Sequence, residues 1–159
     1  MPALCMVVRL RLKVGDEAPD FTLPSHTGEE VTLSQFRGVS NVVLYFYPRD
    51  GTAGCTKQAC SFRDSYEAFQ ELGAEVIGVS SDSLEAHREF AAAHLLPFRL
   101  LSDADNRVRK MYGAMGALNM PGRVTFVIDK RGVIQHTFSS QLRVNRHIDE
   151  ALEILKGLR

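Results

Sequence analysis

The chain has 159 residues, the length of one domain, and its 45% hydrophobic and 24% charged residues are typical of a globular protein. Its 19 basic and 19 acidic residues cancel, so we expect neither nucleic acid nor a membrane surface to be its main partner. No apolar run approaches the roughly 20 residues that span a bilayer, and we expect no secretory signal at the N-terminus.

The sequence divides into an N-terminal extension, residues 1–12, and a single domain, residues 13–159. Near the start of the domain, Phe21–Leu23 and Glu30–Leu33 alternate polar and apolar residues on either side of Thr27-Gly28. Such alternation around a glycine turn predicts a β-hairpin.

The rest of the chain alternates predicted strands with predicted helices. Short runs of branched and aromatic residues predict strands at Asn41–Tyr47, Ala74–Ser80, Phe98–Leu101, Val124–Asp129 and Val133–Phe138. Helical spacing and breakers predict one turn at Ser34–Gly38 and helices at Cys55–Leu72, Leu84–Leu95, Asn106–Tyr112 and through Ile148, Leu152 and Leu155.

Some helix ends and loops are also predicted. Asp82 with Glu85 resembles a capping box, and Asn145 is expected to cap the last helix. Gly113–Gly122 is expected to be a plain loop, since its glycine spacing does not fit a phosphate-binding motif. The element order predicts an α/β protein with a thioredoxin-like fold: a central mixed β-sheet flanked by helices, with the hairpin as an N-terminal extension.

Two of the three cysteines lie where the first long strand gives way to a helix. Cys55 opens the predicted helix and Cys60 follows five positions later, whereas Cys5 falls in the N-terminal extension. The unpaired N–H groups of a helix N-terminus carry partial positive charge, which favours the thiolate, the nucleophilic form of cysteine. The pair therefore indicates a reactive thiol with a partner thiol nearby.

The loop before Cys55 is suited to close approach of a ligand. Gly51 and Gly54 let backbone N–H groups come near a bound molecule. The Thr52 hydroxyl can point at the sulfur or at a bound oxygen, and Pro48 ends the strand and shields one side of the thiol.

Helix geometry restricts how Cys55 and Cys60 can react with each other. Residues five apart on an intact helix have Cα atoms roughly 8.7 Å apart, from the rise, rotation and radius of the helix. A disulfide needs Cα atoms within about 7 Å. A bond between the two sulfurs therefore requires the first turns of the helix to unwind.

Simpler readings of the cysteines are also open. Free cysteines are often ordinary core residues. A structural zinc site needs about four ligands, and the five histidines are not spaced to join the cysteines in one. We therefore expect no metal.

Beyond these features, Pro48-x-x-x-Thr52-x-x-Cys55 resembles the peroxiredoxin signature. Cys55-x-x-x-x-Cys60 is similar to the bacterioferritin comigratory protein / peroxiredoxin Q branch of that family. The resemblance covers about residues 13 to 158 and includes the segments Val14–Phe21, Gly54–Asp64 and Pro121–Asp129.

The resemblance implies a role for each matching residue. Cys55 is expected to be the peroxidatic cysteine and Cys60 the resolving cysteine. The other implied residues contact the peroxide or shape its pocket: Pro48 by shielding the sulfur, Thr52 by hydrogen bonding, Gly54 with Cys55 in substrate binding, and Arg123 by stabilising the thiolate and the leaving oxygen.

The resemblance also implies a monomer without cofactor or metal, which reduces peroxides and is recycled by thioredoxin or a related dithiol protein. Arg49 stands where much of the family has lysine, and the Gly113–Met120 loop leaves the preferred peroxide open. The expected compartment is the bacterial cytoplasm, or a plastid if a transit peptide was removed.

Two other functions are weighed against the peroxidase. A general thiol–disulfide oxidoreductase would be favoured by a Cys-x-x-Cys motif, which this sequence does not contain. A redox-switched binding or chaperone protein would use the disulfide only to change its surface.

Overall fold

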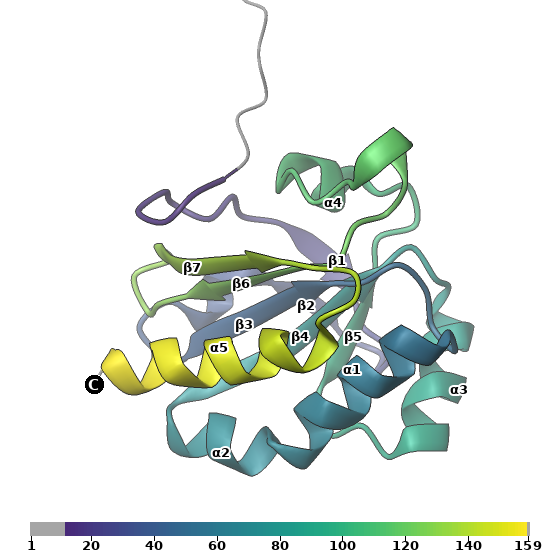
Figure 1. The fold of residues 1–159 in the computed structure, drawn as a ribbon, viewed down its shortest axis with the longest axis horizontal. Coiled ribbons are helices and arrows are strands. Elements are labelled where there is room, and N and C mark those ends of the chain that lie inside the picture. The colour runs from purple at the N-terminus through teal and green to yellow at the C-terminus, as the bar shows by residue number, and fades with distance from the viewer. Residues whose placement is uncertain (1–11, 159) are drawn as a thin grey trace, which may run out of the picture.

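The computed structural model describes residues 12–158, so Cys5 and almost all of the extension predicted over residues 1–12 lie outside the described residues. A five-stranded sheet forms the centre in the order β5-β4-β3-β6-β7 (Figure 1). Its strands are β3 (Asn41–Phe46), β4 (Ala74–Ser80), β5 (Arg99–Ser102), β6 (Val124–Ile128) and β7 (Ile134–Ser139). β3 runs parallel to β4 and antiparallel to β6, which confirms the predicted mixed sheet.

The predicted N-terminal hairpin is present as a separate two-stranded sheet. Its strands β1 (Thr22–Pro24) and β2 (Glu30–Thr32) are antiparallel, and a 3₁₀ turn, η1 (Leu33–Phe36), follows them. The hairpin meets the edge of the central sheet through a bridge between Ser25 and Leu101.

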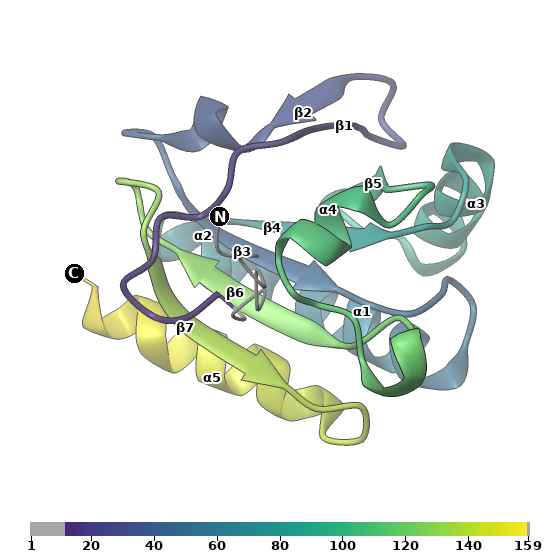
Figure 2. The ribbon, with the colours of Figure 1, turned by 90° about the horizontal axis from the view of Figure 1, so that it is seen from above.

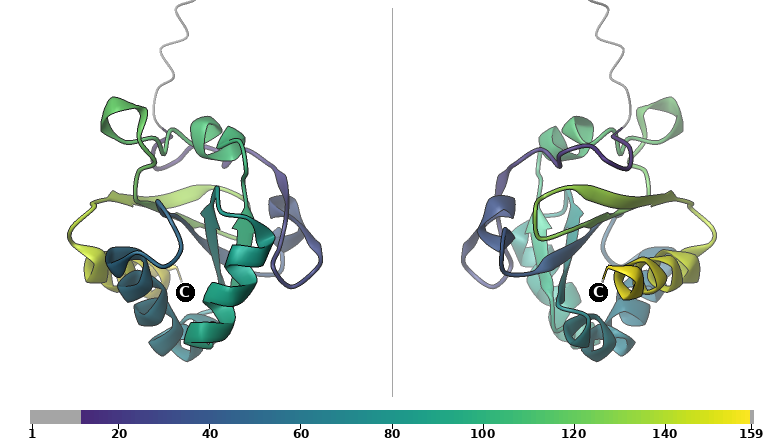
Figure 3. Two further views of the ribbon diagram at one scale, coloured as in Figure 1. Left: turned by 90° about the vertical axis from the view of Figure 1, so that its right-hand side faces the viewer. Right: turned by 90° about the vertical axis from the view of Figure 1, so that its left-hand side faces the viewer.

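The helices and the hairpin cover the two faces of the sheet (Figures 2 and 3). The helical elements are α1 (Ala53–Asp64), α2 (Tyr66–Glu71), α3 (Leu84–His94), α4 (Arg107–Met111), η2 (Ala117–Asn119) and α5 (Val144–Gly157). Helices α1, α2, α3 and α5 share one hydrophobic core with the sheet, whereas the hairpin and α4 share the other.

β3 separates these two cores because alternate side chains of a strand point to opposite faces. Leu44 and Phe46 belong to the core beneath the hairpin and α4, and Tyr45 and Tyr47 to the core beneath α1 and α5. Every residue of β3 is buried, as the continuous apolar run predicts. The last residues of this strand lead directly to the loop before Cys55.

The structure corrects several local predictions. The single helix predicted from Cys55 to Leu72 is two helices, because the chain leaves helical geometry at Ser65. The cap of α3 is Ser83, whose hydroxyl accepts from the Ala86 N–H at 3.1 Å, rather than Asp82.

Three further boundaries differ. Asn145 is inside α5, which begins one residue earlier at Val144, and its side chain accepts a hydrogen bond from Ser61. The turn predicted after Ser34 begins at Leu33. The predicted plain loop contains the short 3₁₀ element η2. Within residues 12–158, no helix combines the length and the apolar character needed to cross a membrane.

Candidate active site

Cys55 is in the first turn of α1, as predicted, with Thr52 as the N-cap residue. Its side chain is 1% exposed and packs in the core with Tyr45, Tyr47 and Ala59. Cys60 is half-buried on the same helix, both thiols are free, and the helix is continuous between them. This is the arrangement expected of a reduced pair.

Arg123 brings a positive charge to the sulfur from the other side of the site. It directly precedes β6 and is 5% exposed. Its Nη2 donates to Cys55 Sγ at 3.4 Å, and its Nη1 donates to Gln58 Oε1 at 2.5 Å. The family resemblance implied that Arg123 lies near Cys55, and the two side chains meet here although they are far apart along the chain.

Gln58 is the site residue that the sequence analysis missed. It is fully buried and lies on the same face of α1 as Cys55, because residues three apart on a helix are neighbours. A glutamine on the buried face of a helix that otherwise presents Ala59 and Phe62 to the core is the signal that could have revealed it.

Gly54 makes room for the guanidinium. A Cβ atom at this position would lie 3.1 Å from Arg123 Nη2, closer than nine in ten real Cβ contacts. The glycine thus lets the arginine pass over the start of α1 to reach Cys55. This is a steric role, in addition to the exposure of backbone N–H groups that the sequence predicts.

Thr52 and Pro48 form the loop side of the site. The Thr52 hydroxyl is exposed and donates to the Arg49 carbonyl at 2.9 Å, so its proton is already engaged. Its oxygen keeps lone pairs that can accept a further hydrogen bond. Pro48 is half-buried and follows directly on the buried Tyr47 at the end of β3. Gly51 turns the chain with a φ of 78°.

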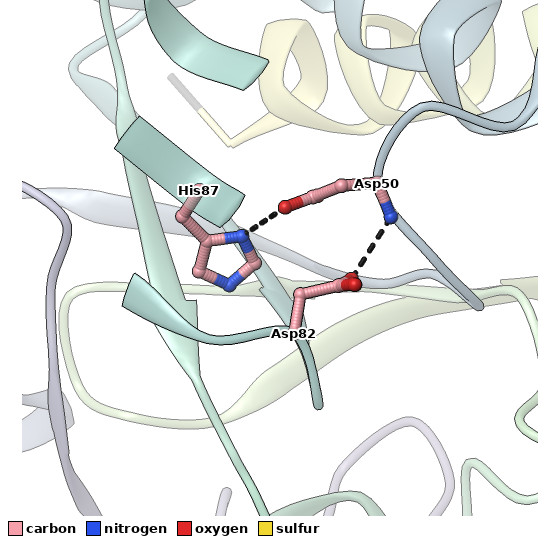
Figure 4. A group of neighbouring side chains, drawn as sticks. All are labelled: Asp50, Asp82 and His87. Atoms are coloured by element: carbon pink, nitrogen blue, oxygen red, sulfur yellow. Dashed lines mark hydrogen bonds and ion pairs between the residues drawn. The ribbon is translucent and has the colours of Figure 1, made fainter. Parts of the chain in front are cut away.

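A partly buried cluster of Asp50, Asp82 and His87 holds this loop in place (Figure 4). Asp50 Oδ2 lies 2.5 Å from His87 Nδ1, and Tyr47 donates its hydroxyl proton to Asp50 Oδ1 at 2.6 Å. The Asp50 N–H donates to Asp82 Oδ2 at 2.9 Å. His87 Nε2 lies 3.0 Å from the Leu101 carbonyl, which can only accept, so Nε2 carries a proton.

The same cluster offers two carboxylates and a histidine within reach of one ion. Each of these groups is already engaged, however: Asp82 Oδ2 also accepts from the Ser80 hydroxyl at 2.5 Å, and both His87 nitrogens have partners. Hydrogen bonding accounts for the cluster without a cation. Its evident effect is to fasten the loop at Asp50 to the start of α3.

A second histidine, His147, is linked through Ser140 to the backbone of Arg123. The Arg123 carbonyl accepts from the Ser140 N–H, and the Ser140 carbonyl accepts from His147 Nε2 at 2.8 Å. Thr125 lies 2.7 Å from His147 Nδ1 and donates its hydroxyl proton there if the ring is neutral. Burial lowers the pKa of His147 to about 4, so the ring is neutral at physiological pH.

Comparison with known proteins places this geometry in a family. The model of the AhpC/TSA family matches residues 14–137. Peroxiredoxin Q, chloroplastic, of Sedum lineare is 52% identical over 147 residues, which cover 91% of this chain and 78% of that protein. The Arabidopsis thaliana protein of the same name is 51% identical over 149 residues, with 92% and 68% covered.

Solved structures agree with this assignment. Peroxidoxin BcpB from Mycobacterium tuberculosis has a TM-score of 0.88 at 39% identity and covers 94% of this chain and 99% of its own. Peroxiredoxin Q from Xanthomonas campestris has a TM-score of 0.83 at 29% identity, with 92% and 96% covered. The chain therefore belongs to the AhpC/TSA family, in the peroxiredoxin Q branch, and has the thioredoxin-like peroxiredoxin fold.

Proposed function

We propose that this thiol peroxidase reduces hydrogen peroxide and small organic hydroperoxides through Cys55, that Cys60 resolves the oxidised form, and that thioredoxin or a similar dithiol protein restores it. The observation that carries the proposal is the Arg123 guanidinium, which donates to the Cys55 sulfur at the N-terminus of α1. A buried cation and a helix N-terminus both favour a thiolate at that position.

In the first step, the Cys55 thiolate attacks one peroxide oxygen. An S–O bond forms as the O–O bond breaks, so the sulfur is oxidised to a sulfenic acid and the peroxide is reduced. The departing oxygen takes up a proton and leaves as water or an alcohol. Arg123 stabilises the negative charge that develops on this oxygen, because its N–H groups are already aimed at the site.

The peroxide is held by groups with complementary hydrogen-bonding roles. Unpaired N–H groups of the first turn of α1, around Gly54 and Cys55, donate to its oxygens. The Thr52 oxygen accepts from the peroxide O–H, because its own proton is donated to Arg49. Pro48 closes one side of the pocket.

In the second step, the Cys60 thiolate attacks the sulfenic sulfur: an S–S bond forms, the S–O bond breaks, and the departing hydroxide takes up a proton from solvent and leaves as water. The intact helix holds the two Cα atoms roughly 8.7 Å apart, so the turn that carries Cys55 must unwind first. The C-terminal part of α1 is anchored, because Phe62 is fully buried and Arg63 donates to the His94 carbonyl at 2.8 Å. Unwinding is therefore proposed for the turns before Cys60.

The test uses two single variants. Cys55→Ser should abolish thioredoxin-driven peroxide reduction. Cys60→Ser should complete one turnover and accumulate a sulfenic acid on Cys55, which a sulfenate-selective reagent traps. Its steady-state peroxide reduction with thioredoxin as the reductant should then fall. Full activity of Cys55→Ser would overturn the assignment of the nucleophile, and unchanged steady turnover of Cys60→Ser would overturn the assignment of the resolving residue.

The chain is further proposed to act as a monomer, which size-exclusion chromatography of the reduced and oxidised forms would test. Relatives named chloroplastic at about 50% identity favour a plastid as its compartment over the bacterial cytoplasm expected from the sequence. Localisation of the tagged full-length protein in its source cells would decide between them.

A further inference from the structure

Arg109 is a buried charge outside the residues assigned so far. It lies on α4, on the face of the sheet opposite α1 and α5 (Figure 1), and is 1% exposed. Burying a guanidinium is unfavourable unless every N–H group finds an acceptor. The position of its acceptors therefore shows what the side chain holds in place.

Each guanidinium nitrogen of Arg109 has a neutral acceptor. Nη1 donates to the Gly122 carbonyl at 2.6 Å, and Nη2 donates to the Tyr47 carbonyl at 2.5 Å. Nε donates to Asn106 Oδ1 at 3.1 Å, and the guanidinium lies 5.7 Å from the centre of the Phe46 ring.

The Tyr47 and Gly122 carbonyls each lie one residue before a residue of the candidate active site. Tyr47 directly precedes Pro48, and Gly122 directly precedes Arg123. The last rung between β3 and β6 is the pair Phe46 and Val124, and beyond it the two strands lead into opposite sides of the active site. Arg109 bridges them where the ladder has ended, at the residue after Phe46 and at the second residue before Val124.

We propose that Arg109 is a positioning residue for peroxide reduction: its planar guanidinium fixes the spacing between the Pro48 loop and Arg123, and so sets how Arg123 meets Cys55. The inference rests on the proposed function. An arginine suits this task because its two Nη groups donate in a rigid fork, whereas a lysine ammonium is a single flexible point.

The charge of Arg109 has a second effect on the site. Burial lowers the pKa of Arg109 to about 10, against the raising influence of Asp103, Tyr47 and Cys55, so it stays protonated at neutral pH. The influence of Cys55 is mutual, since the same cation also favours the Cys55 thiolate. Geometry and charge can therefore be tested separately.

The experiment compares Arg109→Lys, which keeps the charge without the fork, with Arg109→Met, which removes both at similar volume. Lys110→Met is the control, an exposed neighbour on the same helix. Two quantities are measured on protein shown to be folded by circular dichroism: kcat/KM for peroxide, and the rate of Cys55 alkylation by iodoacetamide as a function of pH.

Both Arg109 variants should lose up to about a hundredfold in kcat/KM for peroxide, the order expected when a catalytic group is misplaced by about an ångström. The alkylation profile of Arg109→Met should move to higher pH, while that of Arg109→Lys stays close to the wild-type profile. A role in folding alone would leave the profile of folded protein unchanged. Values equal to those of Lys110→Met for both quantities would overturn the proposal.

A milder variant covers the case in which Arg109 variants do not fold. Asn106 has a φ of 57°, which glycine also adopts, so Asn106→Gly removes only the Nε acceptor. Its kcat/KM should fall in the same direction by a smaller factor, and an unchanged value would count against the proposal. If wild-type protein shows no Cys55-dependent peroxide reduction, the proposed function fails instead, and the alkylation profiles still report on Arg109.

Discussion

Arg123 and Gln58 form a buried pair in which Nη1 of the arginine donates to the amide oxygen of the glutamine at 2.5 Å. Gln58 comes from the same helix as Cys55, so α1 presents both the sulfur and the group that holds the guanidinium against it. Unwinding of this part of α1 would release Arg123 from both partners together. Folding of the helix and assembly of the candidate active site are therefore coupled.

Gln58→Leu tests this coupling. Leucine has a similar volume but leaves Arg123 Nη1 without its acceptor in a buried site. We expect a loss of about 1–3 kcal/mol in the free energy of unfolding, the cost of an unpaired buried donor, and a lower kcat/KM for peroxide. Urea denaturation and steady-state kinetics measure the two effects. Lys57→Leu, at the exposed neighbouring position, is the control, and equal behaviour of the two variants would contradict the coupling.

The sequence predicted the mixed sheet, the hairpin and the thiol at the start of α1, because these depend on local patterns: apolar runs, turn glycines and helical spacing. The pairing of Arg123 with Cys55 came only from resemblance to a family, since nothing local distinguishes Arg123 from a surface arginine. Arg109 was missed for the same reason, and Gln58 was missed although its polar side chain falls on the apolar face of α1. Their roles follow from contacts across the fold, to Arg123 and to the carbonyls of Tyr47 and Gly122.

Helix ends were the least predictable local features. Asp82 has the type and spacing of a cap, yet it accepts hydrogen bonds from Asp50 and Ser80, and Ser83 takes the cap position. Both choices satisfy local rules, and the tertiary contact to Asp50 decides between them. The break at Ser65 is similar, because the apolar spacing continues through it and carries no sign of the kink.

Gly54→Ala should lower activity without lowering stability. Alanine is favoured over glycine inside a helix by roughly 0.5–1 kcal/mol, so the free energy of unfolding should stay the same or rise. The added Cβ meets Arg123 Nη2 at 3.1 Å, so the guanidinium must move by a few tenths of an ångström and kcat/KM for peroxide should fall. Denaturant titration and peroxide kinetics on the same preparation test both signs.

Gly157→Ala is the matched control for this substitution. Gly157 is also helical, at the end of α5, and a Cβ there would meet open space. This variant should keep wild-type kinetics. A Gly54→Ala enzyme with unchanged kcat/KM would show that Gly54 is not needed as clearance for Arg123.

The hydrogen bonds among Asp50, Tyr47 and His87 predict how substitutions of Asp50 affect stability. Asn at this position can still accept from the Tyr47 hydroxyl, and its amide N–H can donate to a neutral His87 Nδ1, whose other nitrogen keeps its proton on the Leu101 carbonyl. Asp50→Asn should therefore stay close to wild type in stability. Asp50→Ala removes the acceptor of both buried groups and leaves the Tyr47 hydroxyl and His87 Nδ1 only their long contact with each other at 3.5 Å, so it should cost about 1–3 kcal/mol in the free energy of unfolding. Equal losses in the two variants would show that the cluster requires an ion pair.

His147 predicts how stability depends on pH. Burial lowers its pKa from 6.5 to about 4, so between these values the unfolded chain binds a proton that the folded chain does not. The free energy of unfolding should therefore fall as pH decreases from 6.5 towards 4. His147 contributes about 3 kcal/mol to this fall, and its contribution should be complete below pH 4. Urea midpoints measured at intervals from pH 7 to pH 4 follow the change.

His147→Gln isolates this contribution from those of other groups, such as His26, whose pKa burial also lowers. The glutamine amide can donate to the Ser140 carbonyl and accept from Thr125, as the neutral ring does, but it does not titrate in this range. The variant should thus show a shallower loss of stability between pH 6.5 and pH 4 than the wild type. Parallel curves would mean that the His147 ring takes up its proton as readily in the folded protein as in the unfolded chain. The buried site that His147 occupies would then accommodate a positive charge.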